Sequence, residues 1–262
     1  YNHPELSSSY LGGKDFVNGD NNPFDDNGHG SHVAGLITAD GKEPSARGAA
    51  PKAGIIAGKV LDGGGSGDLS AIITAIYWAV DGPDDEFGTA DDFGADAISM
   101  SLATGPPFVF NSYCNSAYPS LTNAIKYAVN HGVVVVVAAG NYGTQGVSMP
   151  GCITYSTTVG AVSGSDKIAT FSGRGKGVDI TAPGVNLESA WLGTSYIELS
   201  GTSMATPLVS ATVALVKHDH PSYSPSQVQD ALFKTAKDLG TVGKDNSYGY
   251  GRVVASAAVD YS

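Results

Sequence analysis

Strand-like and helix-like segments alternate along the middle of the chain, and this alternation restricts the fold more than any other feature of the sequence. Residues 53–61, 97–102 and 133–139 are rich in β-branched and small apolar residues, as buried strands are. Residues 70–80 and 121–129, which lie between them, have the apolar spacing of helices. The alternation predicts an α/β fold, a three-layer sandwich with a mostly parallel central sheet and helices on both faces.

Length and composition fit a single domain. The chain has 262 residues, 42% of them hydrophobic, and it contains no apolar run long enough to span a membrane. Its formal net charge of −11 and the absence of a basic patch argue against nucleic-acid binding. A capping box at residues 224–227, with Pro225 at the first helical position, predicts a further helix that extends to about Lys237.

Three separate motifs carry the residue types of a hydrolytic site. Residues 201–207 (GTSMATP) place Ser203 at the first turn of a buried helix, where the helix dipole favours negative charge. A serine needs a base within reach to act as a nucleophile, and His29, flanked by glycines, is the candidate base. Asn141 follows the strand at residues 133–139, where its amide could donate to an oxyanion.

Taken alone, each motif has an ordinary structural interpretation. A Gly-Thr-Ser turn is a common helix N-terminus, and an asparagine after glycine is usually a turn residue. Together and in this order, residues 29–35, 139–141 and 201–207 resemble the histidine, oxyanion and serine motifs of the subtilisin-like serine proteases, the subtilase family. The resemblance extends from residues 3–6 to residues 249–251, so it implies that residues 1–262 form one subtilase catalytic domain.

The resemblance implies a serine endopeptidase that works by acyl transfer. Ser203 would attack the peptide carbonyl, His29 would move the proton, and Asn141 with the Ser203 backbone N–H would form the oxyanion hole. The family's triad aspartate has no counterpart here, because by the family's chain order it lies about five residues before Tyr1. We therefore expect a domain that lacks the first core strand with its aspartate, and that has little activity as it stands.

Three other classes of protein share parts of this pattern. A full-length chain that also lacked the aspartate would be a non-catalytic binding protein with the subtilase fold. A zinc hydrolase that used His29 and His32 would need the spacing and the glutamate of a zincin, which are missing. An α/β-hydrolase would need Gly-x-Ser-x-Gly, which Ala205 breaks. Asp25 and Asp26 are expected to order the loop beside His29.

The resemblance also outlines a substrate cleft. An extended substrate would add as a strand to the edge at residues 63–67, opposite residues 101–105, where Ala103 and Thr104 replace the family's usual Gly-Gly. Leu69, Ile72 and Leu102 would form an apolar S4 pocket, so we expect apolar or aromatic substrate side chains at P1 and P4. The expected substrate-binding residues are Gly65, Gly67, Leu69, Ser101, Leu102, Ala103, Ala138 and Gly140.

An acidic insertion at residues 81–92 has the carboxylates, glycines and proline that suit calcium, although a solvated acidic loop is the alternative. The resemblance implies calcium as a structural ion and no organic cofactor. A second calcium loop of the family corresponds to residues 40–47, where Lys42 and Arg47 bring positive charge, and Glu5 and Asp179 match ligands of cation sites. The expected ligands in the insertion are Asp81, Asp84, Asp85, Asp91 and Asp92.

The two cysteines, Cys114 and Cys152, permit one disulfide in an exported protein, but the sequence does not show whether they lie close enough to form it. The resemblance further implies a secreted, monomeric protease that acts on proteins or peptides. Such a protease would be made as a zymogen with an N-terminal propeptide.

Overall fold

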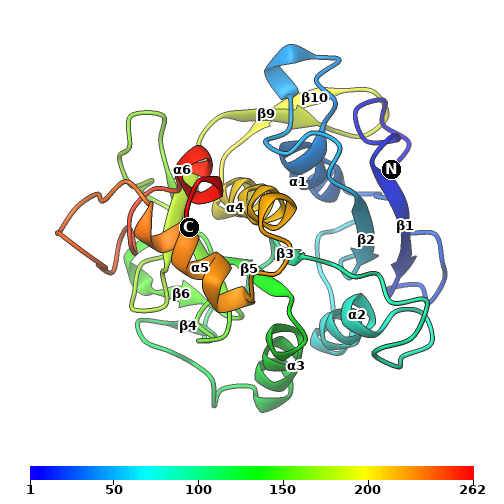
Figure 1. Cartoon of the computed structure of the whole chain (residues 1–262), viewed down its shortest axis with the longest axis horizontal. Coiled ribbons are helices and arrows are strands. Elements are labelled where there is room, and N and C mark those ends of the chain that lie inside the picture. Colours follow the sequence, from blue (N-terminus) through cyan, green and yellow to red (C-terminus); the bar gives the residue numbers. More distant parts are fainter. The chain divides into compact units, whose positions relative to one another are not determined.

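The computed structural model describes all 262 residues and divides the chain into two compact units. The first unit contains residues 1–95 and 188–198, and the second contains residues 96–187 and 199–262. Figure 1 labels the helices and strands of both units.

The second unit is built on a parallel sheet of four strands in the order β3-β5-β7-β8. Strands β5 and β7 are buried along their whole length, as expected for a sheet covered on both faces. Helix α4 packs along all four strands and α3 packs against β5, and Figure 1 shows these helices on opposite sides of the sheet. The elements are β3 (Ala97–Met100), β5 (Val134–Ala138), β7 (Thr157–Val162), β8 (Ile180–Pro183), α3 (Pro119–Asn130) and α4 (Thr202–Asp219).

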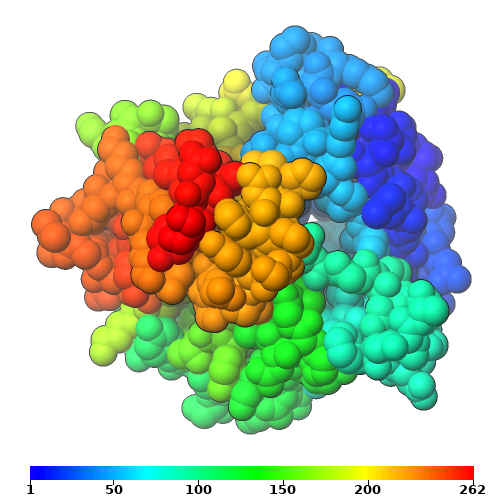
Figure 2. All heavy atoms as spheres, viewed as in Figure 1, coloured from blue at the N-terminus to red at the C-terminus, as the bar shows by residue number.

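The core of this unit lies between the sheet and the C-terminal helices. Val134 and Val136 of β5 belong to the same buried cluster as Val209 and Val213 of α4, because alternate residues of a strand point to the same face. Helices α5 (Pro225–Lys234) and α6 (Ala255–Val259) pack against α4 and against each other. Figure 2 shows the C-terminal residues, in red, beside the orange atoms of α5.

A disulfide joins Cys114 to Cys152 in the second unit, so the pairing that the sequence left open does form. The two Cα atoms are 5.3 Å apart, and the backbone N–H of Cys114 donates to the carbonyl oxygen of Cys152 at 3.0 Å. The cysteines are separated by 38 residues, and closing a loop of that size restricts the unfolded chain by roughly 4 kcal/mol in the chain-entropy treatment. Nearby, β4 (Val109–Phe110) pairs antiparallel with β6 (Val147–Ser148), and a short 3₁₀ helix, η2, spans Gly143–Gln145.

The first unit contains a parallel pair of strands, β1 (Tyr10–Asp15) and β2 (Ile55–Lys59). The chain between them forms α1 (His29–Thr38) and the 3₁₀ helix η1 (Pro44–Ala46), and α2 (Leu69–Asp81) follows β2. A second pair consists of β9 (Leu187–Ala190) and β10 (Tyr196–Leu199). Gly35 of α1 lies so close to Ser189 that an added Cβ would overlap the serine hydroxyl. This close approach fixes α1, which begins with His29, against β9.

The α/β class, the parallel sheet and the five alternating segments are confirmed, with changes of a few residues at their ends. The capping box is present, because Ser224 and Gln227 exchange hydrogen bonds between side chain and backbone. The prediction that this helix reaches Lys237 was wrong, since α5 ends at Lys234. Lys237 instead exchanges backbone hydrogen bonds with Arg252, which draws the chain out of the helix. Among the helices, none combines the length and the apolar character that crossing a membrane would require.

Candidate active site

Ser203 is the second residue of α4, as the serine motif predicts, and its backbone carbonyl oxygen is bound by a residue outside the helix. Pro207 lies one helical turn further on and has no N–H, so the carbonyl oxygen of Ser203 has no helical partner. The hydroxyl of Ser101 donates to that oxygen at 2.8 Å instead. The start of α4 is thereby tied to the segment that follows β3, and the Ser203 Oγ lies 3.5 Å from the Ser101 carbonyl oxygen.

Asn141 lies beside Ser203 in the same unit, and its side chain is oriented by Thr202. The Asn141 Oδ1 accepts hydrogen bonds from the backbone N–H of Thr202 at 3.0 Å and from its hydroxyl at 3.1 Å. Because the oxygen is engaged, the amide nitrogen faces the start of α4, where a Cβ built on Gly201 would lie 3.5 Å from Nδ2. A donor held next to a nucleophile at a helix N-terminus can stabilise an oxyanion.

Gly140 shows why the residue before Asn141 must be small. Its φ is +85°, and an added Cβ would overlap the Ser148 hydroxyl. The Gly140 N–H donates to the Thr202 hydroxyl at 3.1 Å, so Thr202 binds both Gly140 and Asn141. The structure thus brings together the predicted residues Ser101, Gly140, Asn141 and Ser203, with the buried Ala138 at the end of β5. Sequence reasoning missed the roles of Thr202 and Pro207; the proline four residues after Ser203 was the available signal.

Residues 101–105, the expected wall of the substrate cleft, are anchored by Thr104, which is one of the two residues that depart from the family pattern. The Thr104 N–H donates to the Met149 carbonyl oxygen at 2.9 Å, and its hydroxyl donates to the carbonyl oxygens of Phe108 at 2.9 Å and Met149 at 3.1 Å. The Ala103 side chain is exposed and Leu102 is half-buried. Thr104 therefore fastens this wall to the segment around Met149, a role the sequence did not indicate.

His29 is the first residue of α1 in the other unit. Its backbone N–H donates to the Asn27 Oδ1 at 3.3 Å. Burial lowers the pKa of His29 and the nearby Asp25 carboxylate raises it, with a net value below the ordinary 6.5. The ring is therefore neutral around neutral pH, which is the state that a general base requires. His32 is fully buried and its Nε2 lies 3.1 Å from the Ile197 carbonyl oxygen.

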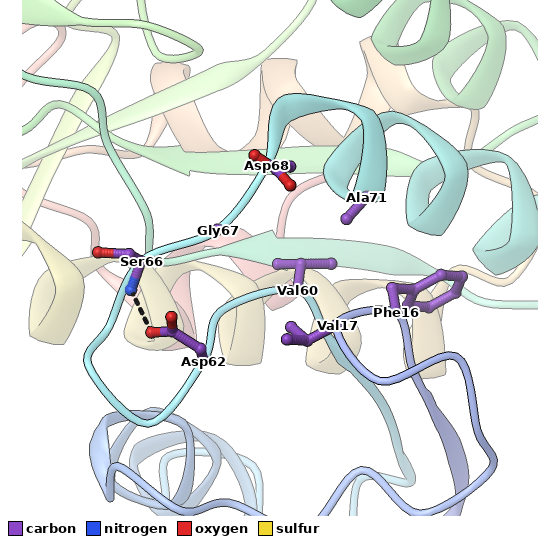
Figure 3. A pocket seen from close by; sticks show the side chains of 8 residues that line it. All are labelled: Phe16, Val17, Val60, Asp62, Ser66, Gly67, Asp68 and Ala71. Atoms are coloured by element: carbon purple, nitrogen blue, oxygen red, sulfur yellow. Dashed lines mark hydrogen bonds between the residues drawn. The ribbon is translucent and has the colours of Figure 1, made fainter.

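The glycine-rich loop expected to bind substrate is ordered by Asp62. The Asp62 Oδ1 accepts hydrogen bonds from the N–H groups of Gly64 and Ser66, both at 2.9 Å, and Figure 3 shows the bond from Ser66. A Cβ on Gly67 would overlap the Val60 carbonyl oxygen, so only glycine allows the loop to return so close to the end of β2. Leu69 begins α2 and is half-buried, and Ile72 is buried in the same helix.

A cavity of about 270 Å³ lies behind this loop. Figure 3 shows apolar side chains on one side of it and the polar side chains of the loop on the other. Neither His29 nor Ser203 is among its lining residues. Its lining residues are Phe16, Val17, Val60, Asp62, Ser66, Gly67, Asp68 and Ala71.

The acidic insertion does not form a ready-made metal site. In the structure, no group of three or more histidine, cysteine, aspartate or glutamate side chains gathers as a metal ion would require. The loop's own N–H groups occupy three of its carboxylates: Gly88 donates to Asp92 at 2.7 Å, Asp84 to Asp91 at 3.2 Å and Glu86 to Asp84 at 2.9 Å. The arrangement as it stands does not fit a calcium ion, and binding by this loop stays a prediction.

Glu5 and Asp179, which match cation ligands of the family, form hydrogen bonds or ion pairs with other residues of the chain. Glu5 is fully buried and accepts the N–H groups of Gly41 at 2.7 Å, Lys42 at 3.1 Å and Glu43 at 2.6 Å, together with the Tyr196 hydroxyl at 3.0 Å. In the second unit, Asp179 accepts the Lys244 ammonium at 2.8 Å and the Thr158 N–H at 2.9 Å.

The hydrogen bonds to Glu5 shift the titration of both side chains. Burial raises the pKa of Glu5, but the bonds from the backbone and from Tyr196 outweigh it, so the net pKa is below the usual range. Burial and the bond to Glu5 raise the pKa of Tyr196 to about 12. A carboxylate thus anchors the loop at residues 41–43.

Comparison with known proteins shows which family the chain belongs to. The sequence profile of the subtilase family matches residues 1–251. Over 256 residues the chain is 39% identical to Subtilisin Savinase of Lederbergia lenta, covering 98% of this chain and 86% of that protein. It is equally similar, at 39%, to an alkaline protease of Alkalihalobacillus alcalophilus, covering 60% of that protein. It is 37% identical over 262 residues to a thermophilic serine proteinase of a Bacillus species, strain AK1, covering 59% of that protein.

The match to the family profile spans nearly the whole chain, and the chain covers most of the Savinase sequence. The chain therefore belongs to the subtilase family, a family of serine endopeptidases. The resemblance expected from residues 29–35, 139–141 and 201–207 is confirmed.

Proposed function

We propose that the protein hydrolyses peptide bonds in proteins or peptides through an acyl-enzyme formed on Ser203. The observation that carries the proposal is the pair of hydrogen bonds from Thr202 to the Asn141 Oδ1, which leave the amide nitrogen as a donor beside Ser203. In this mechanism Ser203 attacks the carbonyl while His29 takes its proton and later gives it to the leaving amine. Asn141 Nδ2 and the Ser203 N–H stabilise the oxyanion, and water then releases the acyl group.

The nucleophile can be tested by labelling with a fluorophosphonate. The triad aspartate that we expect upstream of Tyr1 stays a prediction, so the protein used should include the residues encoded there. We expect one label per chain, on Ser203, and none after Ser203→Ala. A protein that folds and has an aspartate upstream but takes no label would contradict the proposal and support the non-catalytic alternative. Nothing in the fold or in the comparisons favours that alternative.

We propose a preference for apolar or aromatic side chains at P1 and P4 of the substrate. Support comes from the apolar candidates on each unit: the half-buried Leu69 and the buried Ile72 on one, and the half-buried Leu102 on the other. Profiling with a peptide library, randomised at P1 and P4, should show enrichment of leucine, phenylalanine or tyrosine at both positions. A profile dominated by arginine or lysine at P1 would refute this preference.

Calcium is proposed as a structural ion of the acidic insertion, on the strength of its composition alone. Binding would require the carboxylates of residues 81–92 to exchange their present N–H donors for the ion. Thermal unfolding with and without a chelator should then show a lower melting temperature in the chelator. The variant Asp84→Asn/Asp85→Asn should lose this difference, while Asp230→Asn, on the exposed face of α5, should keep it. Equal melting temperatures for the unmodified protein with and without chelator would defeat the proposal.

We propose that the protease is secreted, monomeric and made with a propeptide. The disulfide between Cys114 and Cys152 supports export, because such bonds persist in oxidising compartments. The net charge of −11 suits a soluble protein that does not self-associate.

A further inference from the structure

The turn that precedes α1 is organised by one carboxylate. The Asp25 Oδ1 accepts the N–H groups of Asn27 at 3.0 Å and Gly28 at 2.8 Å. The Asp25 Oδ2 accepts both the N–H and the hydroxyl of Ser31 at 2.7 Å. The residue at the N-cap of α1 is Gly28, which has no side chain to cap the helix. Asp25 therefore supplies the cap from three residues further upstream.

The Asp25 carboxylate lies close to the backbone next to His29. A Cβ built on Gly30, the next residue after His29, would lie 3.5 Å from the Asp25 Oδ2. The structure shows no hydrogen bond between this carboxylate and the His29 ring, so Asp25 does not take the place of a triad aspartate. Asp25 holds the backbone of the turn that carries His29 through hydrogen bonds, and its charge acts on the His29 imidazole.

We propose that Asp25 is a positioning residue for the catalytic base, fastening the first turn of α1 and holding a negative charge beside His29. This inference rests on the proposed function, because it assigns a role in catalysis through His29. The charge partly offsets the effect of burial, which lowers the pKa of His29. Asp25 thus keeps the imidazole basic enough to accept the serine proton.

The other charged groups of this unit near the turn are engaged elsewhere. Asp26 forms an ion pair with Lys59 at 2.8 Å, and Lys59 also lies 3.5 Å from Asp15. Among these groups, Asp25 is the one whose charge acts on His29.

The test is an NMR titration of the His29 imidazole, with the signal assigned by its loss in His29→Gln. In Asp25→Asn the midpoint should move to lower pH, because the favourable charge is gone while the burial remains. A purely structural cap would give the opposite sign, since loosening the turn would expose the ring and raise its pKa. An unchanged or raised midpoint in folded Asp25→Asn would overturn the proposal. If this variant does not fold, Asp25→Ser, which keeps a capping hydroxyl, provides the same test.

Two control variants separate the charge from the hydrogen bonds. Ser31→Ala removes one hydrogen bond to Asp25 but keeps its charge, so it should lower the melting temperature and leave the His29 midpoint in place. Asp26→Asn removes an adjacent charge that is paired with Lys59, and it should also leave the midpoint in place. A shift in Asp26→Asn as large as that in Asp25→Asn would refute the assignment to Asp25. The titration needs no turnover, so a failure of Ser203 to react with fluorophosphonate would count against the proposed function and not against this inference.

Discussion

In a protein that includes the residues encoded upstream of Tyr1, replacing Ser203 with alanine is expected to reduce the turnover of peptide hydrolysis by a factor of about 10⁶, the size of loss measured for a subtilisin of this family. The reason is that the acyl-enzyme cannot form without the Ser203 Oγ, whatever the rest of the site does. The Oγ makes one weak contact, 3.5 Å from the Ser101 carbonyl oxygen, so the substitution should leave stability almost unchanged. Steady-state kinetics on a chromogenic peptide and a melting curve of the same sample measure both effects.

The control for this experiment is Ser165→Ala, which removes the hydroxyl of an exposed serine in the same unit. Its hydroxyl lies 3.0 Å from that of Ser163 and touches none of the proposed site residues. Turnover of Ser165→Ala should equal that of the unmodified protein. Residual activity of Ser203→Ala above one hundredth of normal would mean that another group is the nucleophile.

Asn141→Asp should lower kcat by about 10² to 10³, as loss of the corresponding donor does in a subtilisin, while KM changes little. The aspartate has the shape of asparagine and can still accept both hydrogen bonds from Thr202, so the local structure should persist. It offers no N–H to the oxyanion and places a negative charge where negative charge develops. The effect therefore falls on the transition state and not on substrate binding.

Asn115→Asp is the matched control for the oxyanion prediction. Asn115 is in the same unit and holds Thr154 through two hydrogen bonds, at 2.8 Å and 3.0 Å, away from Ser203. The same chemical change there should leave kcat unaltered. A large rise in KM for Asn141→Asp, with kcat unchanged, would show that Asn141 binds substrate instead of stabilising the oxyanion.

The parts of the fold that the sequence predicted are those with simple periodicity. Residues 133–139 form an unbroken apolar run that is short and rich in β-branched valine, and these two properties favour a buried strand over a buried helix. Strands β1 and β7 were not predicted, because YLGGKD and TTVGAV contain glycines or hydroxyl residues that weaken the apolar pattern. What makes them strands is pairing with β2 and with β5 and β8, which are distant in sequence. Tertiary pairing of this kind overrides local preference.

In the candidate site, too, the local motifs could be predicted from the sequence and the contacts between distant residues could not. Ser203, His29 and Asn141 could be found because their motifs are local, each a few residues long. The hydrogen bonds that orient the site could not be predicted, because they join residues that are far apart in the sequence: Ser101 to Ser203, and Thr202 to Asn141. The calcium prediction relied on composition, and composition cannot tell whether carboxylates converge on an ion or accept N–H groups of their own loop, as Asp91 and Asp92 do.

The bond between Tyr196 and Glu5 has a consequence for behaviour in strongly basic media. An ordinary tyrosine ionises near pH 10, and a phenolate could no longer donate to a carboxylate, but the pKa of Tyr196 is raised to about 12. A group whose pKa is raised on folding stabilises the native state fully below its unfolded value and loses that contribution only as the pH rises through the folded value. The strand that carries Tyr196 and the segment around Glu5 therefore stay hydrogen-bonded at pH values at which an ordinary tyrosine has already ionised.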